Sequence, residues 1–240
     1  MVLLALAIAP GVAIALYFYF RDQYNREPRR HLIISFFLGG ISAVVAGLLE
    51  EALFSLTGIQ IGNGVVNSMI AAYLLVGFTE EWTKYIMVRS YAFRQPEFDE
   101  PLDGIIYSVM VGMGFATLEN VLYVMDSGYT TAILRMFLSV PAHATFAVIM
   151  GYELGKAKFA GRKRIFYILS ALLGASFWHG SYDFFLFLQQ DRQIERIIPT
   201  GLLFLGAVGS LVWSIRLSKR AMQEHLNLSR RSFEEMMPEP

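Results

Sequence analysis

Seven long apolar runs, separated by short polar segments, dominate the hydrophobic pattern of the chain. Each is roughly 20 residues long, which is the length that an α-helix needs to cross a bilayer core of about 30 Å. The expected spans are 2–20, 32–54, 65–88, 104–125, 131–154, 165–188 and 198–217. The pattern therefore predicts an all-α fold, a polytopic transmembrane bundle of about seven helices over residues 1–217, followed by a polar tail at 218–240.

Lysine and arginine residues alternate between the polar segments, and this alternation predicts the orientation of the bundle. The segments near 21–31, 89–94, 155–164 and 218–240 are basic, whereas 55–64 and 126–130 contain no Lys or Arg. The segment after the sixth span has two arginines, each beside an acidic residue. Because basic loops stay on the inner side of a membrane, we expect the N-terminus outside and the C-terminus in the cytoplasm. The first run is expected to be a retained helix, since no positive segment precedes it.

Composition agrees with a membrane protein and narrows the possible chemistry. Hydrophobic residues make up 55% of the chain and charged residues 17%, whereas about a quarter of a typical soluble domain is charged. The chain has no cysteine, which excludes disulfides, thiolate metal sites and a cysteine nucleophile. A net charge of zero without a basic stripe gives no reason to expect a nucleic-acid partner, so the lipid bilayer is the expected environment.

Ionisable side chains inside four of the spans are the most informative feature, because one charge at the bilayer centre costs about 2.5–3.5 kcal/mol. They and their polar neighbour are Glu80, Glu81 and Lys84 in the third span, Glu119 and Asn120 in the fourth, His143 in the fifth, and His179 and Asp183 in the sixth. Counting residues at a rise of about 1.5 Å places most of them within about 6 Å of the membrane midplane. We therefore expect four helices to contribute polar groups to one shared site.

Helical spacing refines this expectation. Glu80 and Lys84 are four residues apart and share a helix face, as do His179 and Asp183. Glu80 and Glu81 are adjacent and about 100° apart, so they are not expected to point at one centre. One should face a cavity, while the other pairs with Lys84 or a neighbouring helix. A carboxylate in such a cavity is a candidate general base. Taken singly, each group also fits a packed ion pair or an interhelical hydrogen bond.

A second acidic pair, Glu50 and Glu51, lies near the outer end of the second span. It has no basic residue nearby in the sequence. We therefore expect both carboxylates to lie at the membrane interface and not in the site.

Three short motifs follow one another along the membrane spans. They are Glu80-Glu81-x-x-Lys84, Phe115-x-x-x-Glu119 and His179-x-x-x-Asp183. In this order, and with their flanking residues, they resemble the PrsW family of glutamic-type intramembrane proteases. The likeness covers nearly all of the chain up to about residue 188. That family looks like a bacterial branch of the larger group of CAAX proteases and bacteriocin-processing enzymes, in which a His usually stands in place of Glu119 and an Asn in place of Asp183. A bacterial cell membrane is the implied location.

The resemblance implies a role for each residue. Glu80, with Glu81 as its neighbour, would activate a water molecule that attacks a peptide carbonyl. His179 would stabilise the developing oxyanion, and Asp183 would orient the His179 ring. Glu119 would share a proton with Glu80 or hold the water from the opposite side. The supporting residues would be Lys84, His143 and Asn120. No metal or other cofactor is expected. The implied partner is a single-pass membrane anti-sigma factor, cut in site-1-type regulated proteolysis on its extracytoplasmic side.

Other functions fit the same residues. A zinc-dependent intramembrane protease could hold its metal through Glu80, Glu119, His143 and His179, although the chain lacks the closely spaced HExxH motif. A proton relay or small transporter also uses Glu, His and Asp side chains near the midplane. The absence of a visible internal repeat argues against a transporter. The intact set of motifs argues against a pseudoprotease that only binds its substrate.

Overall fold

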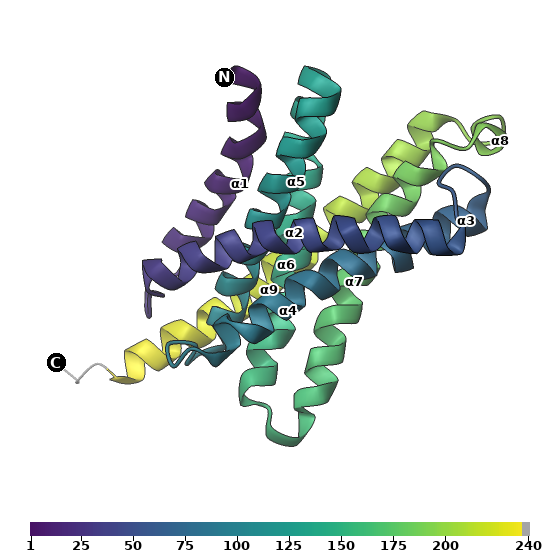
Figure 1. Ribbon diagram of the computed structural model, residues 1–240. Helices are drawn as coiled ribbons and strands as arrows, with labels where there is room; N and C mark the ends of the chain where they lie inside the picture. Colours follow the sequence, from purple (N-terminus) through teal and green to yellow (C-terminus); the bar gives the residue numbers. More distant parts are fainter. Residues whose placement is uncertain (237–240) are drawn as a thin grey trace.

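Helices form the secondary structure of the chain in the computed structural model, which describes residues 1–236 (Figure 1). In order they are α1 (Val2–Arg21), α2 (Arg29–Thr57), α3 (Val65–Ile70), the π-helix η1 (Ala71–Phe78), α4 (Thr79–Ser90), the 3₁₀ turn η2 (Ala92–Arg94), α5 (Pro101–Phe137), α6 (Ser139–Phe159), the 3₁₀ turn η3 (Gly161–Lys163), α7 (Arg164–Leu188), α8 (Arg192–Glu195) and α9 (Thr200–Met236). The prediction of an all-α fold is confirmed.

The seven predicted spans all fall on helical stretches. Within the described residues, four stretches are long and apolar enough to cross a membrane, namely Val2–Arg21, Arg29–Thr57, Pro101–Phe159 and Thr200–Met236. The third and sixth predicted spans are not among these four. The third is divided by η1, and both carry the polar residues of the predicted site, which dilute their apolar character. The predicted orientation of the bundle stays a prediction.

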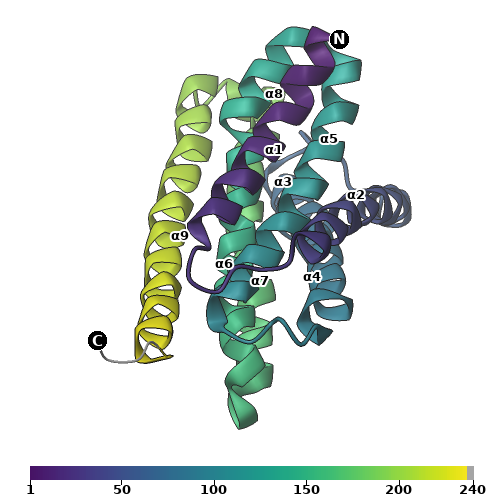
Figure 2. The same ribbon diagram turned by 90° about the vertical axis from the view of Figure 1, so that its left-hand side faces the viewer.

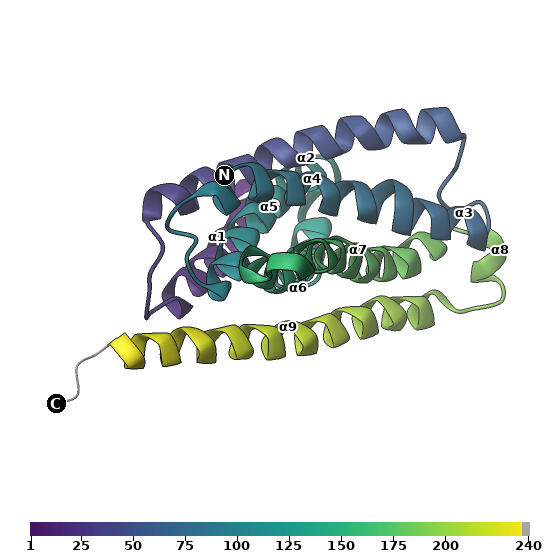
Figure 3. The same ribbon diagram turned by 90° about the horizontal axis from the view of Figure 1, so that it is seen from below.

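A hairpin of two helices occupies the middle of the bundle. Gly128 has φ 79° and ψ −158° and interrupts α5, so the chain turns back where a short polar segment was predicted. The rest of α5 continues into α6. The arms cross closely, since a side chain on Gly104 would collide with the backbone of Gly151 and Gly155. Small residues at such crossings let helix backbones approach in lipid. Helices α2 and α9 flank the bundle on opposite sides, with α5, α6 and α7 between them (Figures 2 and 3).

The third predicted span changes its helix type just before the predicted site. It begins as α3, passes through the π-helix η1 and returns to an α-helix at Thr79. π-helical turns often occur at functional sites. Helix η1 packs tightly on α7, because a Cβ on Gly77 would lie 3.0 Å from the backbone nitrogen of Gly180. This close contact brings Glu80 and Glu81 of α4 beside His179 of α7.

Helix α9 runs without interruption across the predicted boundary at residue 217. Its second half packs on the bundle: the Ser218 hydroxyl donates to the Thr145 carbonyl oxygen at 3.0 Å, and the ring centroids of His225 and Tyr152 are 4.5 Å apart. The division into a bundle and a tail remains a prediction. The last four residues of that tail, 237–240, lie outside the described residues.

Candidate active site

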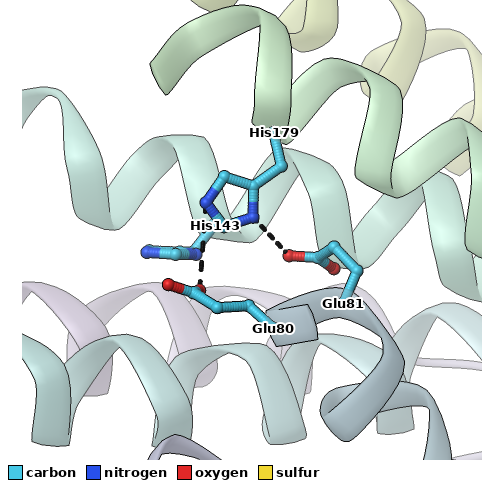
Figure 4. Close-up of side chains that lie close together, drawn as sticks. All are labelled: Glu80, Glu81, His143 and His179. Atoms are coloured by element: carbon cyan, nitrogen blue, oxygen red, sulfur yellow. Dashed lines mark hydrogen bonds and ion pairs between the residues drawn. The ribbon is translucent and has the colours of Figure 1, made fainter. Parts of the chain in front are cut away.

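Four helices bring the predicted site residues together inside the bundle. Figure 4 shows Glu80 and Glu81 of α4, His143 of α6 and His179 of α7 pointing into one space. Each offers one carboxylate oxygen or ring nitrogen, and these four atoms all lie within 4.8 Å of one another. All four residues are buried, with 5% exposure or less. The expected convergence of polar groups from separate spans is therefore present in the structure.

The Lys84 ammonium lies in the middle of this group. Its Nζ donates to Glu81 Oε1 at 2.7 Å and to Glu80 Oε2 at 3.1 Å, and it lies 3.1 Å from His143 Nδ1. It also sits 3.9 Å from the ring centroid of Phe115. The expectation that the two adjacent glutamates would not share a centre is wrong. Their long side chains reach around the helix, and one cation attracts both carboxylates.

His179 connects the glutamate pair to Asp183. Its Nδ1 lies 2.9 Å from Glu81 Oε1, and its Nε2 lies 3.2 Å from Asp183 Oδ2 and 3.8 Å from Glu80 Oε2. The ring stacks on Phe146 at a centroid distance of 4.9 Å. Asp183 stands one helical turn from His179 on the same face, as its spacing predicts. The His179 ring is therefore fixed by a carboxylate on either side and by an aromatic ring against one face.

His143 is held in a similar way by Glu119 of α5. Its Nε2 lies 2.8 Å from Glu119 Oε2, which also pairs with Arg135 at 2.9 Å. A Lys ammonium can only donate hydrogen bonds. His143 Nδ1 therefore accepts from Lys84, and His143 Nε2–H donates to Glu119. Arg135 Nε in turn donates to Asn120 Oδ1 at 2.9 Å. Asn120 thus supports the site through Arg135 and does not reach its centre.

A cavity of about 480 Å³ opens beside this group. Glu80, Glu119, His143, His179 and Asp183 line it, whereas Glu81 and Lys84 are absent from its lining and lie behind Glu80. The prediction that one member of the glutamate pair faces a cavity agrees with this geometry. Of the two adjacent glutamates, Glu80 is thus the one that lines the cavity.

Two further charged residues line the cavity and were missed from the sequence. Arg135 of α5 was not considered, although it lies inside the predicted span 131–154. Glu50 of α2 was expected at the interface, but it lines the cavity, and its Oε1 is buried without a partner. Glu51 is exposed and does not line the cavity. Both missed residues lie within apolar runs, and that position is the signal that could have identified them.

Comparison with known proteins identifies the family. The family model described as "PrsW family intramembrane metalloprotease" matches residues 27–214. The chain is 40% identical to protease PrsW of Geobacillus kaustophilus over 188 residues, which cover 78% of this chain and 81% of that protein. It is 39% identical to protease PrsW of Bacillus subtilis over 185 residues, which cover 77% and 82% of the two chains. The match to protease PrsW of Clostridioides difficile reaches 237 residues at 32% identity and covers 96% and 94%. No solved structure matches the chain.

The chain belongs to the PrsW family of intramembrane proteases. The resemblance seen in the ordered motifs is confirmed, and so are the membrane location and the assignment as a peptidase that acts on protein substrates. The family description includes a metal, however. It therefore favours the zinc-dependent alternative over the metal-free glutamate mechanism expected first.

The donor set of this PrsW-family site fits a metal such as zinc. Nδ1 of His143 lies 3.1 Å from the central Lys84 Nζ and Nδ1 of His179 lies 2.9 Å from Glu81 Oε1, while Glu119 and Asp183 contact the two Nε2 atoms at 2.8 and 3.2 Å. Carboxylates that orient ligating imidazoles in this way are a common feature of zinc sites. Glu81 Oε2 is buried without a partner. Two imidazole nitrogens and two carboxylates are suitable ligands for zinc.

Proposed function

We propose that the chain is a metal-dependent intramembrane endopeptidase. The observation that supports this most directly is the convergence of Glu81, His143 and His179 beside a cavity that Glu80 lines. Each of these side chains is buried. Placing several ionisable groups inside the bundle costs free energy, and such groups cluster at functional sites. The description of the family as metalloproteases supports the same reading.

In this proposal, Glu81, His143 and His179 hold the metal. Glu119 and Asp183 keep the two imidazole rings in the required tautomer and orientation. A bound zinc ion would supply Lewis acidity towards the scissile carbonyl. Lys84 Nζ lies among the same ligand atoms, so the ammonium must move aside when a metal binds.

Glu80 acts as the general base in this scheme. It lines the cavity, within 3.1 Å of the Lys84 ammonium, and can accept a proton from a water molecule that attacks the substrate carbonyl. The same carboxyl group can then return the proton to the leaving amine. Arg135, at the cavity wall, adds a positive charge that favours the developing oxyanion.

The position of Lys84 favours a second candidate, a metal-free glutamic protease. A buried ammonium already provides the positive charge that a metal would otherwise bring, and it contacts Glu80 and Glu81 directly. In that mechanism Glu80 again activates water, and His179 and Lys84 stabilise the oxyanion. The two candidates share Glu80 as base and differ in the source of the positive charge.

The substrates that we propose are membrane-spanning proteins, because the site lies within the helices of the bundle. The resemblance drawn from the sequence further suggests a single-pass anti-sigma factor that is cut in regulated proteolysis.

Reconstitution tests the function. The purified chain is placed in liposomes with a single-pass anti-sigma factor, and cleavage is followed while bound metal is measured by mass spectrometry. We expect one zinc per chain, loss of cleavage with a chelator and recovery with zinc. We also expect Glu80→Gln and His179→Ala to abolish cleavage, while the exposed Glu51→Gln retains it. Full cleavage by metal-free protein would support the glutamic mechanism. Full cleavage by both site variants would overturn either mechanism.

A further inference from the structure

A second cavity, of about 570 Å³, lies between α1 and α2 on the outside of the bundle. The two helices diverge from their connecting segment at residues 22–28, and α5 lies behind them (Figure 1). Most of its lining is apolar, and Met110 of α5 contributes to it. Leu16, Ile33 and Phe37 are among the other apolar residues that line it. It is separate from the protease cavity, whose lining residues are different.

Two arginines and a tyrosine form one end of this groove. Arg26 and Arg29 both line it, with their guanidinium carbons 5.3 and 5.8 Å from the ring centroid of Tyr19. Arg29 Nε donates to the Tyr19 hydroxyl at 3.0 Å, and Arg26 Nε donates to the Asp22 carbonyl oxygen at 2.9 Å. Each guanidinium is thus held through its Nε, and both arginine side chains are exposed.

The positive charge at this end is not neutralised by direct pairing. Within residues 1–236, no carboxylate forms an ion pair with Arg26 or Arg29. The nearest candidate, Asp22, is buried, and its Oδ2 accepts from the Glu27 backbone nitrogen at 3.0 Å. Arg26 and Arg29 therefore place two exposed guanidinium groups beside the Tyr19 ring, where they can bind an anion.

We propose that this groove binds one anionic phospholipid, with its phosphate between Arg26 and Arg29 and an acyl chain along the apolar walls. Guanidinium groups bind phosphate oxygens in a bidentate manner. In a zwitterionic headgroup the phosphate is accompanied by a cationic amine, which two arginines disfavour. Basic pockets between membrane helices are suitable sites for anionic lipid headgroups. Because the apolar walls continue directly from the arginines, one molecule with a charged head and a hydrocarbon chain matches both parts.

The side on which the groove opens also favours a lipid. Leu16, Ile33 and Phe37 line it and are 50%, 57% and 67% exposed, so its apolar walls face the surroundings of the bundle. These surroundings are hydrocarbon for a helix that spans a membrane. A lipid can therefore enter sideways without crossing a polar barrier.

Lipid titration of the purified full-length chain in detergent tests this proposal. Dioleoylphosphatidylglycerol and dioleoylphosphatidylcholine are compared by native mass spectrometry and by the midpoint of thermal unfolding. We expect about tenfold tighter binding of the anionic lipid, based on the attraction of two basic residues near a membrane surface. The variant Arg26→Gln/Arg29→Gln should lose this preference, because it removes both guanidinium charges. Both side chains are exposed, so the helices should keep their packing.

Arg30→Gln is the matched control, because Arg30 is exposed on the same segment and does not line the groove. It should keep the tenfold preference. Ile33→Trp, which fills the groove, should weaken binding of both lipids while the unfolding midpoint without lipid stays unchanged. An unaltered preference in the double arginine variant would overturn the proposal. Equal competition by glycerol phosphate, which has no acyl chain, or displacement of the lipid by a second copy of the chain would overturn it as well.

Discussion

Two clusters of buried charged residues in the chain balance their charge differently. The site cluster consists of Glu80, Glu81, Lys84, His143 and His179 with Glu119, Asp183 and Arg135. Its carboxylates pair directly with cationic or ring-nitrogen groups. The acidic cluster consists of Asp22, Glu27, Glu100 and Asp103, where the α1–α2 and α4–α5 connections meet α5. Its contacts come from hydroxyl and backbone N–H groups.

Hydrogen bonds organise the acidic cluster. The Tyr107 hydroxyl donates to Glu27, and the backbone nitrogens of Asp99 and Glu100 donate to Asp103 Oδ2 at 2.9 and 2.8 Å. Burial raises the pKa of Glu27 and of Glu100 to about 7. These two carboxyl groups are therefore partly protonated near neutral pH. Protonation thus lowers the negative charge of the acidic cluster, which joins the α1–α2 and α4–α5 connections to α5.

The difference indicates where chemistry can occur. Carboxylates that are neutralised by movable cations can exchange those cations for a metal or for the developing charges of a reaction. Carboxyl groups neutralised by protons gain nothing from such an exchange and contribute to packing. Burial of acidic groups alone therefore does not identify a site, whereas burial together with counter-charges from other helices does.

The largest expected effect comes from a change in the site cluster, with a matched change in the acidic cluster as its control. Glu81→Gln should reduce cleavage about a thousandfold, because it removes the carboxylate that contacts both Lys84 and His179. Glu27→Gln keeps a hydrogen-bond acceptor for Tyr107, so we expect cleavage within a factor of about three of the parent. Cleavage rates at equal protein concentration in liposomes measure both. Equal losses in the two variants would remove the functional distinction between the clusters.

Lys84→Met should produce the next largest effect, in this case on stability. Two buried carboxylates lose their common cation, which typically lowers the free energy of unfolding by about 3–5 kcal/mol. Zinc should restore more of the stability in this variant than it adds to the parent, because the competing ammonium is gone. Unfolding in the presence of chelator and of zinc measures the effect. Identical stabilisation of both proteins by zinc would contradict competition between Lys84 and the metal.

A smaller effect is expected from the adjacent pair on α2. Glu50→Leu should lower cleavage about tenfold, equivalent to about 1.4 kcal/mol, since it removes the buried Oε1, which can accept a hydrogen bond from the substrate backbone within the cavity. Glu51→Leu should leave the rate unchanged, because that side chain is exposed. The ratio of kcat/KM values for these two variants measures the contribution. A ratio near one would place Glu50 outside the part of the cavity that the substrate uses.

The smallest effect concerns pH and the acidic cluster. The folded-state pKa of Glu100 is about 7, above the 4.5 of an unperturbed Glu, so the folded chain binds more protons than the unfolded chain between these values. Its contribution to stability is therefore intact at low pH and is lost as pH rises towards 7. Glu100→Gln should reduce the drop in the unfolding midpoint between pH 5 and pH 8 by about 2–4 °C. An unchanged pH profile would show that Glu100 titrates normally.

The sequence predicted much of this arrangement because membrane helices must satisfy their own backbone hydrogen bonds and because charge inside them is costly. Those two constraints were enough to anticipate the helices and the convergence of Glu80, Glu119, His143 and His179. The polar segment at 126–130 likewise predicted the turn that forms around Gly128.

Other features depend on three-dimensional packing and could not be inferred in this way. The shared position of Glu80 and Glu81 at Lys84 depends on side-chain rotamers, which the spacing along a helix does not specify. The position of Glu50 at the cavity depends on how α2 packs beside the other helices. Whether the site fits a metal depends on which ring nitrogens face the other ligand atoms, and the order of residues in the chain carries no information about that.

The π-helix η1 also determines the direction in which the side chains that follow it in the third span point. A π-helix accommodates extra residues in a turn, whereas each residue of an α-helix advances by about 100°. If the same eight residues closed into a regular α-helix without losing one, each would advance by a larger angle than in the π-helix, and Glu80, Glu81 and Lys84 would rotate away from His143 and His179. The glutamate motif would remain intact in the sequence and yet point elsewhere. The helix type of this eight-residue stretch, together with the glutamates themselves, therefore determines whether the site can assemble.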